Sequence, residues 1–348
     1  MNKTPNKPLK LRPGDRARVK SPEAILETLD GNGCLDTMPF MPEMFDSCGH
    51  VFTIHSRADK TCDTATQTGG RKLSDTVHLP GQRCDGSAHG GCQAACLNFW
   101  KEAWLERIEG SGRGSESIAY SRAQLDAAKS SIAKDTTANS DVSGAPVYSC
   151  QATRLPEYTT PLSPWDLRQY WRDVTTNKVP ITRVLRVAFL SLYRMIVATG
   201  IGYRFWVDAY NFVQKARNQP PWPRRSGTLN STPTEILDLN IGEYVRVKSH
   251  DQILETLDKD NRNRGLSFDA EMVRFCGKTL PVHGRVEKIV NEGTGEMMNF
   301  SNPCIILKDS WCSSDLSACR HFCPRSIYHY WREIWLERVP ASELPKTP

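Results

Sequence analysis

The feature that most constrains the fold of this 348-residue chain is an internal repeat at an offset of 228 residues. The segment 25–30 (Ile-Leu-Glu-Thr-Leu-Asp) recurs unchanged at 253–258, and Cys84 recurs as Cys312. Because the same local order returns at one fixed spacing, we expect two domains of the same fold.

Each copy combines short alternating segments, which indicate strands, with helical patterns. In the first copy, residues 11–21 predict a turn and a strand, and Ser21 is placed to cap a short helix over 22–30. Apolar residues between 92 and 107 recur at helical spacing and predict a closing helix. We therefore predict an α+β protein with two small SH3-like β-barrels, each closed by a C-terminal helix and joined by a helical middle segment.

Changes in composition give the expected domain boundaries. We predict a flexible tail over 1–10, a Cys-rich barrel over 11–109, a flexible linker over 110–146, a helical middle segment over 147–217, a Pro-rich linker over 218–240 and a second Cys-rich barrel over 241–340.

The middle of the chain is basic. Residues 154–225 carry twelve Lys or Arg against four Asp or Glu, whereas the whole chain has a formal charge of only +6. This surplus favours an anionic partner such as nucleic acid, or else it forms a solvated basic face. Three arginines within the apolar run that starts at Ile181 argue against a membrane span, and they leave an interfacial amphipathic helix open.

The N-terminal residues 1–8 lack the apolar stretch of a secretory signal, and the chain has no run of about 18 uncharged apolar residues. We therefore expect a cytoplasmic protein. In that compartment its twelve cysteines would remain thiols or bind metal rather than form disulfides.

Four cysteines recur in matching order in the two copies. The last two of each set are spaced Cys-x-x-x-Cys, which on a helix places both sulfurs on one face. At the N-terminus of a helix the dipole favours thiolate, the form that a metal requires. The predicted metal ligands are Cys48, Cys84, Cys92 and Cys96 in the first copy and Cys276, Cys312, Cys319 and Cys323 in the second.

Four sulfur ligands suit tetrahedral zinc, with an iron–sulfur cluster as the second choice. His89 and His321 lie between these cysteines and could replace a ligand or support one. A closed set of four thiolates makes the metal structural, whereas three ligands with His89 as a mobile fourth would permit catalysis. The alternative is that the cysteines are reduced thiols that pack as small apolar side chains.

Two further cysteines, Cys62 and Cys150, have no counterpart in the other copy. Cys62 is a candidate nucleophile because the neighbouring Lys60 would lower the pKa of its thiol, and His89 is the other candidate catalytic residue. The chain contains no Gly-x-Ser-x-Gly, His-Glu-x-x-His or dinucleotide-binding motif. These absences disfavour the familiar hydrolases, zinc proteases and Rossmann enzymes.

Five motifs of the first half stand out as blocks: 12–15 (Arg-Pro-Gly-Asp), 39–44 (Pro-Phe-Met-Pro-Glu-Met), 60–63 (Lys-Thr-Cys-Asp), 84–93 (Cys-Asp-Gly-Ser-Ala-His-Gly-Gly-Cys-Gln) and 148–153 (Tyr-Ser-Cys-Gln-Ala-Thr). Together with the repeated segment they resemble an uncharacterised family of bacterial hypothetical proteins with a duplicated Cys-containing domain, often met beside biosynthetic genes. The resemblance spans most of the chain and implies no activity. The second copy lacks the His-Gly-Gly of 89–91, so an active copy would be the first.

We therefore hypothesise a zinc-binding tandem-repeat protein that acts as a binding or scaffold module for a protein, peptide or nucleic-acid partner. The alternative is a metal- or cysteine-dependent biosynthetic enzyme with its active site in the first copy. The sequence identifies neither a substrate nor a partner.

Overall fold

The computed structural model describes residues 8–109, 116–138, 144–217, 219–223, 225–317 and 320–343. They form two compact units. The first unit contains the described residues up to Val184, together with Lys288–Asn299 and Phe322–Ser326. The second contains Leu185–Glu287, Phe300–His321 and the described residues from Ile327 onward. Two segments of the C-terminal half therefore belong to the first unit, which differs from the expected contiguous domains at 11–109 and 241–340.

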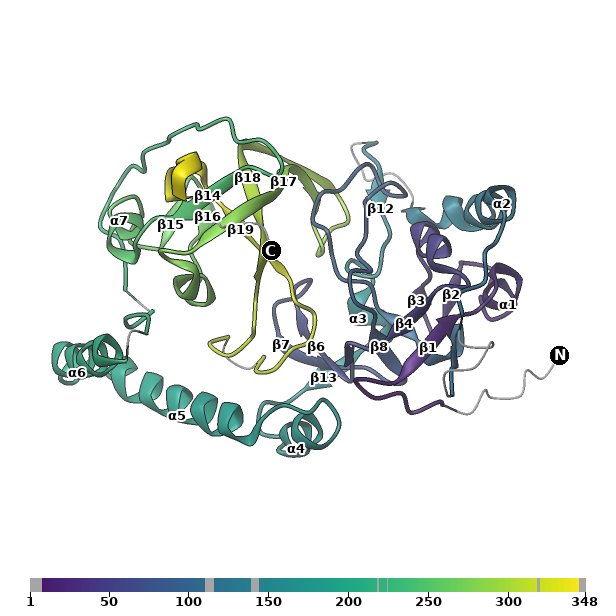
Figure 1. Ribbon diagram of the computed structural model, residues 1–348, viewed down its shortest axis with the longest axis horizontal. Coiled ribbons are helices and arrows are strands. Elements are labelled where there is room, and N and C mark those ends of the chain that lie inside the picture. The colour runs from purple at the N-terminus through teal and green to yellow at the C-terminus, as the bar shows by residue number, and fades with distance from the viewer. Residues whose placement is uncertain are drawn as a thin grey trace. The chain divides into compact units, whose positions relative to one another are not determined.

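Strand β1 (Arg16–Val19) is the middle strand of a three-stranded sheet in the first unit. It pairs antiparallel with β4 (Val51–Thr53) on one side and with β10 (Leu105–Arg107) on the other, and Figure 1 shows β1 beside β4. Ala17 and Val19 are fully buried on one face of β1, as expected for a strand with one face on the core. The hydroxyl of Ser21 then accepts a hydrogen bond from the backbone of the following helix and caps it.

The other strands of the first unit form small antiparallel sheets. These are β2 (Cys34–Leu35) with β3 (Met38–Pro39); β5 (Ser56–Arg57), β8 (Thr76–His78) and β9 (Trp100–Lys101); β6 (Lys60–Asp63), β7 (Gly69–Lys72) and β13 (Thr160–Leu162); and β11 (Thr137–Ala138) with β12 (Val147–Tyr148). The helices are α1 (Pro22–Leu26), α2 (Arg122–Ile132), α3 (Leu155–Tyr158) and α4 (Arg168–Thr175), with 3-10 helices η1 (Pro42–Ser47), η2 (Glu102–Trp104) and η4 (Ala133–Thr136).

The second unit has one larger sheet, with strand order β19–β18–β17–β14–β20. Helix α5 (Ile181–Ala198) begins in the first unit and continues into the second, and strands β17 and β18 contribute residues to both. The bounds are β14 (Tyr244–Val247), β15 (Arg262–Asn263), β16 (Leu266–Ser267), β17 (Thr279–Val290), β18 (Met297–Trp311), β19 (Tyr328–Trp331) and β20 (Leu336–Arg338); α6 (Tyr203–Ala216) and α7 (His250–Leu254); and η5 (Ala270–Phe275), η6 (Glu333–Trp335) and η7 (Ala341–Glu343).

The predicted pair of SH3-like barrels is wrong, because the described residues form several small separate sheets and no closed barrel. In a barrel each strand has a hydrogen-bonded neighbour on both sides. In the first unit β4 and β10 are the edges of one three-stranded sheet, and β5 and β9 are the edges of another. Strands β1 to β13 are only two to four residues long, too short to coil around a common core. The protein is mixed α+β.

The helix predicted to close each copy is also absent. Residues 93–99 are irregular apart from one isolated bridge at Leu97, and β9, η2 and β10 follow them. Trp100 and Trp104 are fully buried, as their spacing suggested. The two rings are buried by a strand, one turn of 3-10 helix and a second strand as completely as a helix would bury them. The spacing of the tryptophans therefore could not distinguish a helix from this strand–turn–strand arrangement.

The segment expected to be a flexible linker, 110–146, contains helix α2. The hydroxyl of Ser121 caps this helix, and Ala128 and Ile132 pack into the core of the first unit. Residues 110–115 and 139–143 of the expected linker lie outside the described residues. The range predicted to be helical, 147–217, contains α3, α4, α5 and α6. Helix α6 starts after Gly202, which has a left-handed backbone conformation with a φ of 63°.

The two units use matched hydrogen bonds to hold equivalent elements. The indole N–H of Trp104 donates to the hydroxyl of Thr28 at 3.1 Å, and that of Trp335 donates to Thr256 at 2.9 Å. Strand β1 pairs with β4 and β10, as β14 pairs with β17 and β20. Thr28 and Thr256 are one repeat offset apart in the sequence. The internal repeat remains a prediction from the sequence, and these matched contacts are compatible with it.

A buried carboxylate fixes the start of one 3-10 helix in each unit, η2 in the first and η6 in the second. Glu102 accepts hydrogen bonds from the backbone N–H groups of Lys10 and Leu11, both at 2.8 Å, and pairs with Arg57 at 2.6 Å. In the second unit, Glu333 at the start of η6 pairs with Arg285 at 2.8 Å and accepts two backbone N–H groups in the same way. A carboxylate can be buried at low cost only because these charged and polar partners replace its water.

No helix in the described parts of the chain has both the length and the apolar character that crossing a membrane requires.

Replacing Glu102 by Ala is expected to lower the free energy of unfolding of the first unit by about 2–4 kcal/mol, since it removes one of the two carboxylates that pair with Arg57 and leaves the backbone N–H groups of Lys10 and Leu11 without their acceptor. The matched control is Asp126→Ala, which breaks the exposed pair with Arg122 and should cost less than about 0.5 kcal/mol. Urea unfolding followed by tryptophan fluorescence compares the two variants. Equal losses in both would contradict the role assigned to Glu102.

Candidate functional site

The loop from Cys84 to Cys96 folds back on itself through glycine. The N–H groups of His89 and Gly91 both donate to the carbonyl of Gly86, at 3.1 and 2.9 Å. Gly86 has a φ of 74°, and a Cβ at this position would lie 2.0 Å from the backbone oxygen of Cys92. Only glycine fits here. The two ends of the loop meet where the N–H of Cys84 donates to the carbonyl of Cys96 at 2.8 Å.

This loop forms one wall of a cavity in the first unit, which we call the thiol cavity. It is lined by four cysteines and one histidine: Cys84, His89, Cys92, Cys96 and Cys150. Cys150 comes from the segment after β12. Glu292 and Arg325, from the two C-terminal segments that complete the first unit, also line it. The fold therefore assembles the cavity from parts of the chain that are distant in sequence.

Two of the sulfurs have polar neighbours within the cavity wall. The Sγ of Cys84 lies 3.4 Å from Nε2 of His89, whose side chain is almost fully buried. The Sγ of Cys92 accepts a hydrogen bond from the backbone N–H of Val290 at 3.3 Å. His89 therefore stands beside a cysteine rather than on the surface of its loop.

Burial raises the pKa of three thiols that line the cavity, those of Cys84, Cys96 and Cys150. It raises the pKa of Cys96 to about 12, and it raises the pKa of Cys84 well above its usual value, with further contributions from Glu43 and from the neighbouring cysteines. The pKa of Cys150 is also raised by burial. Burial raises the pKa of the adjacent Glu43 carboxyl to about 7. A thiolate in this cavity would need a cation beside it.

Two other sequence candidates in the first unit do not line the thiol cavity. Cys48 packs in the hydrophobic core, and burial raises the pKa of its thiol to about 12. Cys62 lies in β6, and its backbone N–H donates to the Sγ of Cys323 at 3.1 Å. The ammonium of Lys60, expected to activate Cys62, is instead paired with Asp173 at 2.6 Å.

The ligands predicted for the second copy are divided between the two units. Cys276 and Cys312 lie in the second unit, whereas Cys323 belongs to the first. Cys312 has Glu271 nearby, as Cys84 has Glu43, and burial raises the pKa of Cys312 to about 11. His321 lies in the second unit with its Nε2 3.1 Å from the hydroxyl of Ser191. Cys319 is outside the described residues.

In the parts of the chain that the structure describes, no three His, Cys, Asp or Glu side chains are arranged to hold a metal ion as they stand. The expected set of Cys48, Cys84, Cys92 and Cys96 is not one group, because Cys150 lines the thiol cavity and Cys48 does not. Cys150 has no repeat partner in the sequence. The only feature of the sequence that singled out Cys150 was its position in the Tyr-Ser-Cys-Gln-Ala-Thr block.

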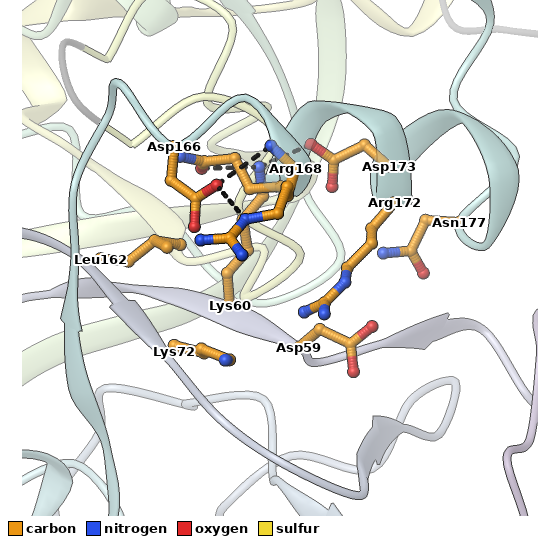
Figure 2. A pocket seen from close by; sticks show the side chains of 10 residues that line it. Asp59, Lys60, Lys72, Leu162, Asp166, Arg168, Arg172, Asp173 and Asn177 are labelled. Atoms are coloured by element: carbon orange, nitrogen blue, oxygen red, sulfur yellow. Dashed lines mark hydrogen bonds and ion pairs between the residues drawn. The ribbon is translucent and has the colours of Figure 1, made fainter.

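A second cavity of the first unit is lined mainly by charged side chains, and we call it the charged pocket (Figure 2). Its walls come from β6, β7, β13 and α4 together with the residues next to them. The lining residues are Asp59, Lys60, Lys72, Leu162, Asp166, Arg168, Gln169, Arg172, Asp173 and Asn177. The sequence showed an excess of basic residues over 154–225. It could not predict that Lys60 and Lys72, from the N-terminal part of the chain, would lie beside basic residues of that range.

The ion pair of Lys60 and Asp173 closes the inner side of the charged pocket. Both side chains are buried, and their charged atoms are 2.6 Å apart. Burial lowers the pKa of Lys60 and raises the pKa of Asp173 to about 6, and the attraction between the two opposes both shifts. Lys60 also lies 5.2 Å from the ring centre of Tyr170 and 5.5 Å from that of Phe322, which further stabilises its charge.

No protein-family model matches this chain, and neither the curated proteins nor the solved structures compared with it gave a match.

Replacing Gly86 by Ala is expected to open the loop of the thiol cavity, because its Cβ would collide with backbone rather than with a movable side chain. Native-state alkylation read by mass spectrometry should then label Cys92 and Cys96 much faster than in the parent protein. The control is Gly81→Ala: Gly81 also has a positive φ of 72°, but a Cβ added there would meet nothing within 4 Å. That variant carries only the backbone strain of about 1–2 kcal/mol. Equal labelling in both variants would contradict the assigned packing of Gly86.

Proposed function

We propose that the first unit binds a metal centre in the thiol cavity, with Cys84, Cys92, Cys96 and Cys150 as its ligands. The observation that carries this proposal is that four cysteines from two separate segments line one cavity. Dispersed cysteines that only fill the core have no reason to gather in this way. Each sulfur is joined to its backbone through one rotatable bond, so a change of rotamer moves the sulfur without moving the backbone.

Thiolate ligands favour zinc among the divalent ions, and they also hold iron–sulfur clusters. Four thiolates around one zinc ion carry a net negative charge. The buried guanidinium of Arg325 lines the same cavity, but it pairs at 3.0 Å with Glu292, which also lines it, so its charge offsets that of the thiolates only in part. His89, beside Cys84, is placed to donate a hydrogen bond to a ligand sulfur and so to orient it.

A centre closed by four sulfurs leaves no position for a substrate, so its role in this proposal is structural. It would hold the loop 84–96 against the segment that carries Cys150. The chain would then act as a binding module. If His89 or water took the place of one sulfur, the centre would have an open position and the enzyme hypothesis would apply.

The exposed face of helix α5 supports a protein or peptide as the partner. Large apolar side chains on this helix are more than half exposed, and surface patches of this kind commonly mark contacts with other proteins. They are Ile181, Leu185, Phe189, Leu192 and Met195. A nucleic-acid partner would instead be held by phosphate contacts and would be released by salt.

The metal content of protein purified without added metal tests the proposed centre. We expect zinc and a featureless visible spectrum, and iron with visible absorption would identify a cluster on the same ligands. Cys150→Ser should remove this metal, whereas Cys48→Ser, a burial-matched control, should keep it. Metal retained by Cys150→Ser, or lost equally from both variants, would contradict the ligand set.

A further inference from the structure

The carboxylates of the charged pocket are already engaged. Asp173 pairs with Lys60, and Asp166 accepts hydrogen bonds from both the backbone N–H and Nε of Arg168. Asp59 accepts from Nε of Arg57 at 3.1 Å. These carboxylates therefore have limited capacity to neutralise further cations in the pocket.

Two cations of the pocket remain without such a partner. Among the described residues, neither Lys72 nor Arg172 has a side-chain hydrogen bond or ion pair, although Arg172 is close enough to Asp166 to help lower the pKa of that carboxyl. Figure 2 shows Arg168 and Arg172 extending from helix α4 toward the side of the pocket on which Lys72 and Asp59 lie. The free cations thus face a common space.

The strand register concentrates positive charge in this place. Lys60 and Lys72 are direct cross-strand partners in β6 and β7, so their side chains lie on the same face of the sheet. Like charges directly opposite one another destabilise a sheet. Asp173 offsets the charge of Lys60, whereas no described residue offsets that of Lys72. An anion would remove this repulsion.

The walls of the pocket are held in place by contacts that do not involve the free cations. The side-chain oxygen of Asn177 accepts the backbone N–H of Arg57 at 2.8 Å, which fixes the end of α4 to β5. The amide of Gln169 donates to the carbonyl of Ser163 at 2.8 Å. A site with fixed walls loses little conformational entropy when it binds a ligand.

The pocket also has the size that a small oxyanion needs. Its volume is about 100 Å³, several times the volume that holds one water molecule. Arg172 offers a planar fork suited to two oxygens of one group, and Lys72 offers a mobile point charge. Four cations and three carboxylates line the pocket, so an added negative charge is favoured.

We infer that the charged pocket binds the oxyanion group of a small molecule, a phosphate or a carboxylate, with Arg172 and Lys72 as its direct contacts. This site is separate from the thiol cavity and does not depend on the proposed metal centre. Arg168 and Lys60, each neutralised by a carboxylate, shape the pocket rather than bind the anion.

Isothermal titration calorimetry of the full chain with sodium phosphate and with sodium acetate, at constant ionic strength set by chloride, tests this site. We expect saturable binding of at least one of the two ions. Arg172→Gln and Lys72→Gln should each weaken it about tenfold or more, the usual effect of losing a charge-assisted hydrogen bond. Binding of phosphate only, or of acetate only, identifies the source of the oxyanion group.

The control variant is Arg122→Gln, which removes one positive charge from an exposed helix of the same unit and should leave binding unchanged. Circular dichroism establishes that each variant is folded, and the two pocket variants provide independent tests of the same site. The inference is overturned if neither ion binds saturably. It is also overturned if Arg122→Gln weakens binding as much as the pocket variants do, since the affinity would then depend on the net charge of the protein rather than on the pocket.

Discussion

The buried guanidinium of Arg325 is the interaction on which the first unit most depends. Its side chain is 1% exposed, and it donates to the hydroxyl of Thr64 and pairs with Glu292 at 3.0 Å. Thr64 also hydrogen-bonds to Glu292. A buried charge is tolerated only when such partners surround it. These contacts join the end of β6 to the segments Lys288–Asn299 and Phe322–Ser326, so the first unit cannot be completed until Arg325 has been synthesised.

The two units have matched contacts around their 3-10 helices, but the thiol cavity and the charged pocket both lie in the first unit. The pairs Glu102–Arg57 and Glu333–Arg285 hold the same places in the two units. Before the equivalent 3-10 helices, however, the first unit runs through short strands and the loop 84–96, whereas the second runs through β17 and β18, of twelve and fifteen residues. Long paired strands satisfy their backbone groups with one another. The described cysteines that follow β18, Cys312 and Cys323, fall in different units, so they are not gathered in one unit as Cys84, Cys92 and Cys96 are.

Local signals in the sequence could indicate the repeat and several helices, because both follow from spacing along the chain. The cap at Ser21 and the apolar periodicity of residues 181–217 are of this kind. The same reasoning failed for residues 92–107, where spacing could not separate a helix from a strand, a turn and a strand. Local spacing could not predict the grouping of the cysteines either. Cys150 joins the thiol cavity and Cys323 contacts Cys62 only through long-range folding, and no local pattern encodes either contact.

The segment 322–326 links the two sites of the first unit. Phe322 lies against Lys60 at the inner side of the charged pocket, and three residues later Arg325 lines the thiol cavity. Strand β6 makes a second connection, because Lys60 and Cys62 lie on one face of it and Cys62 is hydrogen-bonded to Cys323. The two sites therefore share the same supports, strand β6 and the segment 322–326, although different side chains line them. Because Phe322 and Arg325 are only three residues apart, the placement of this one segment sets the position of a ring at the charged pocket and of a guanidinium in the wall of the thiol cavity.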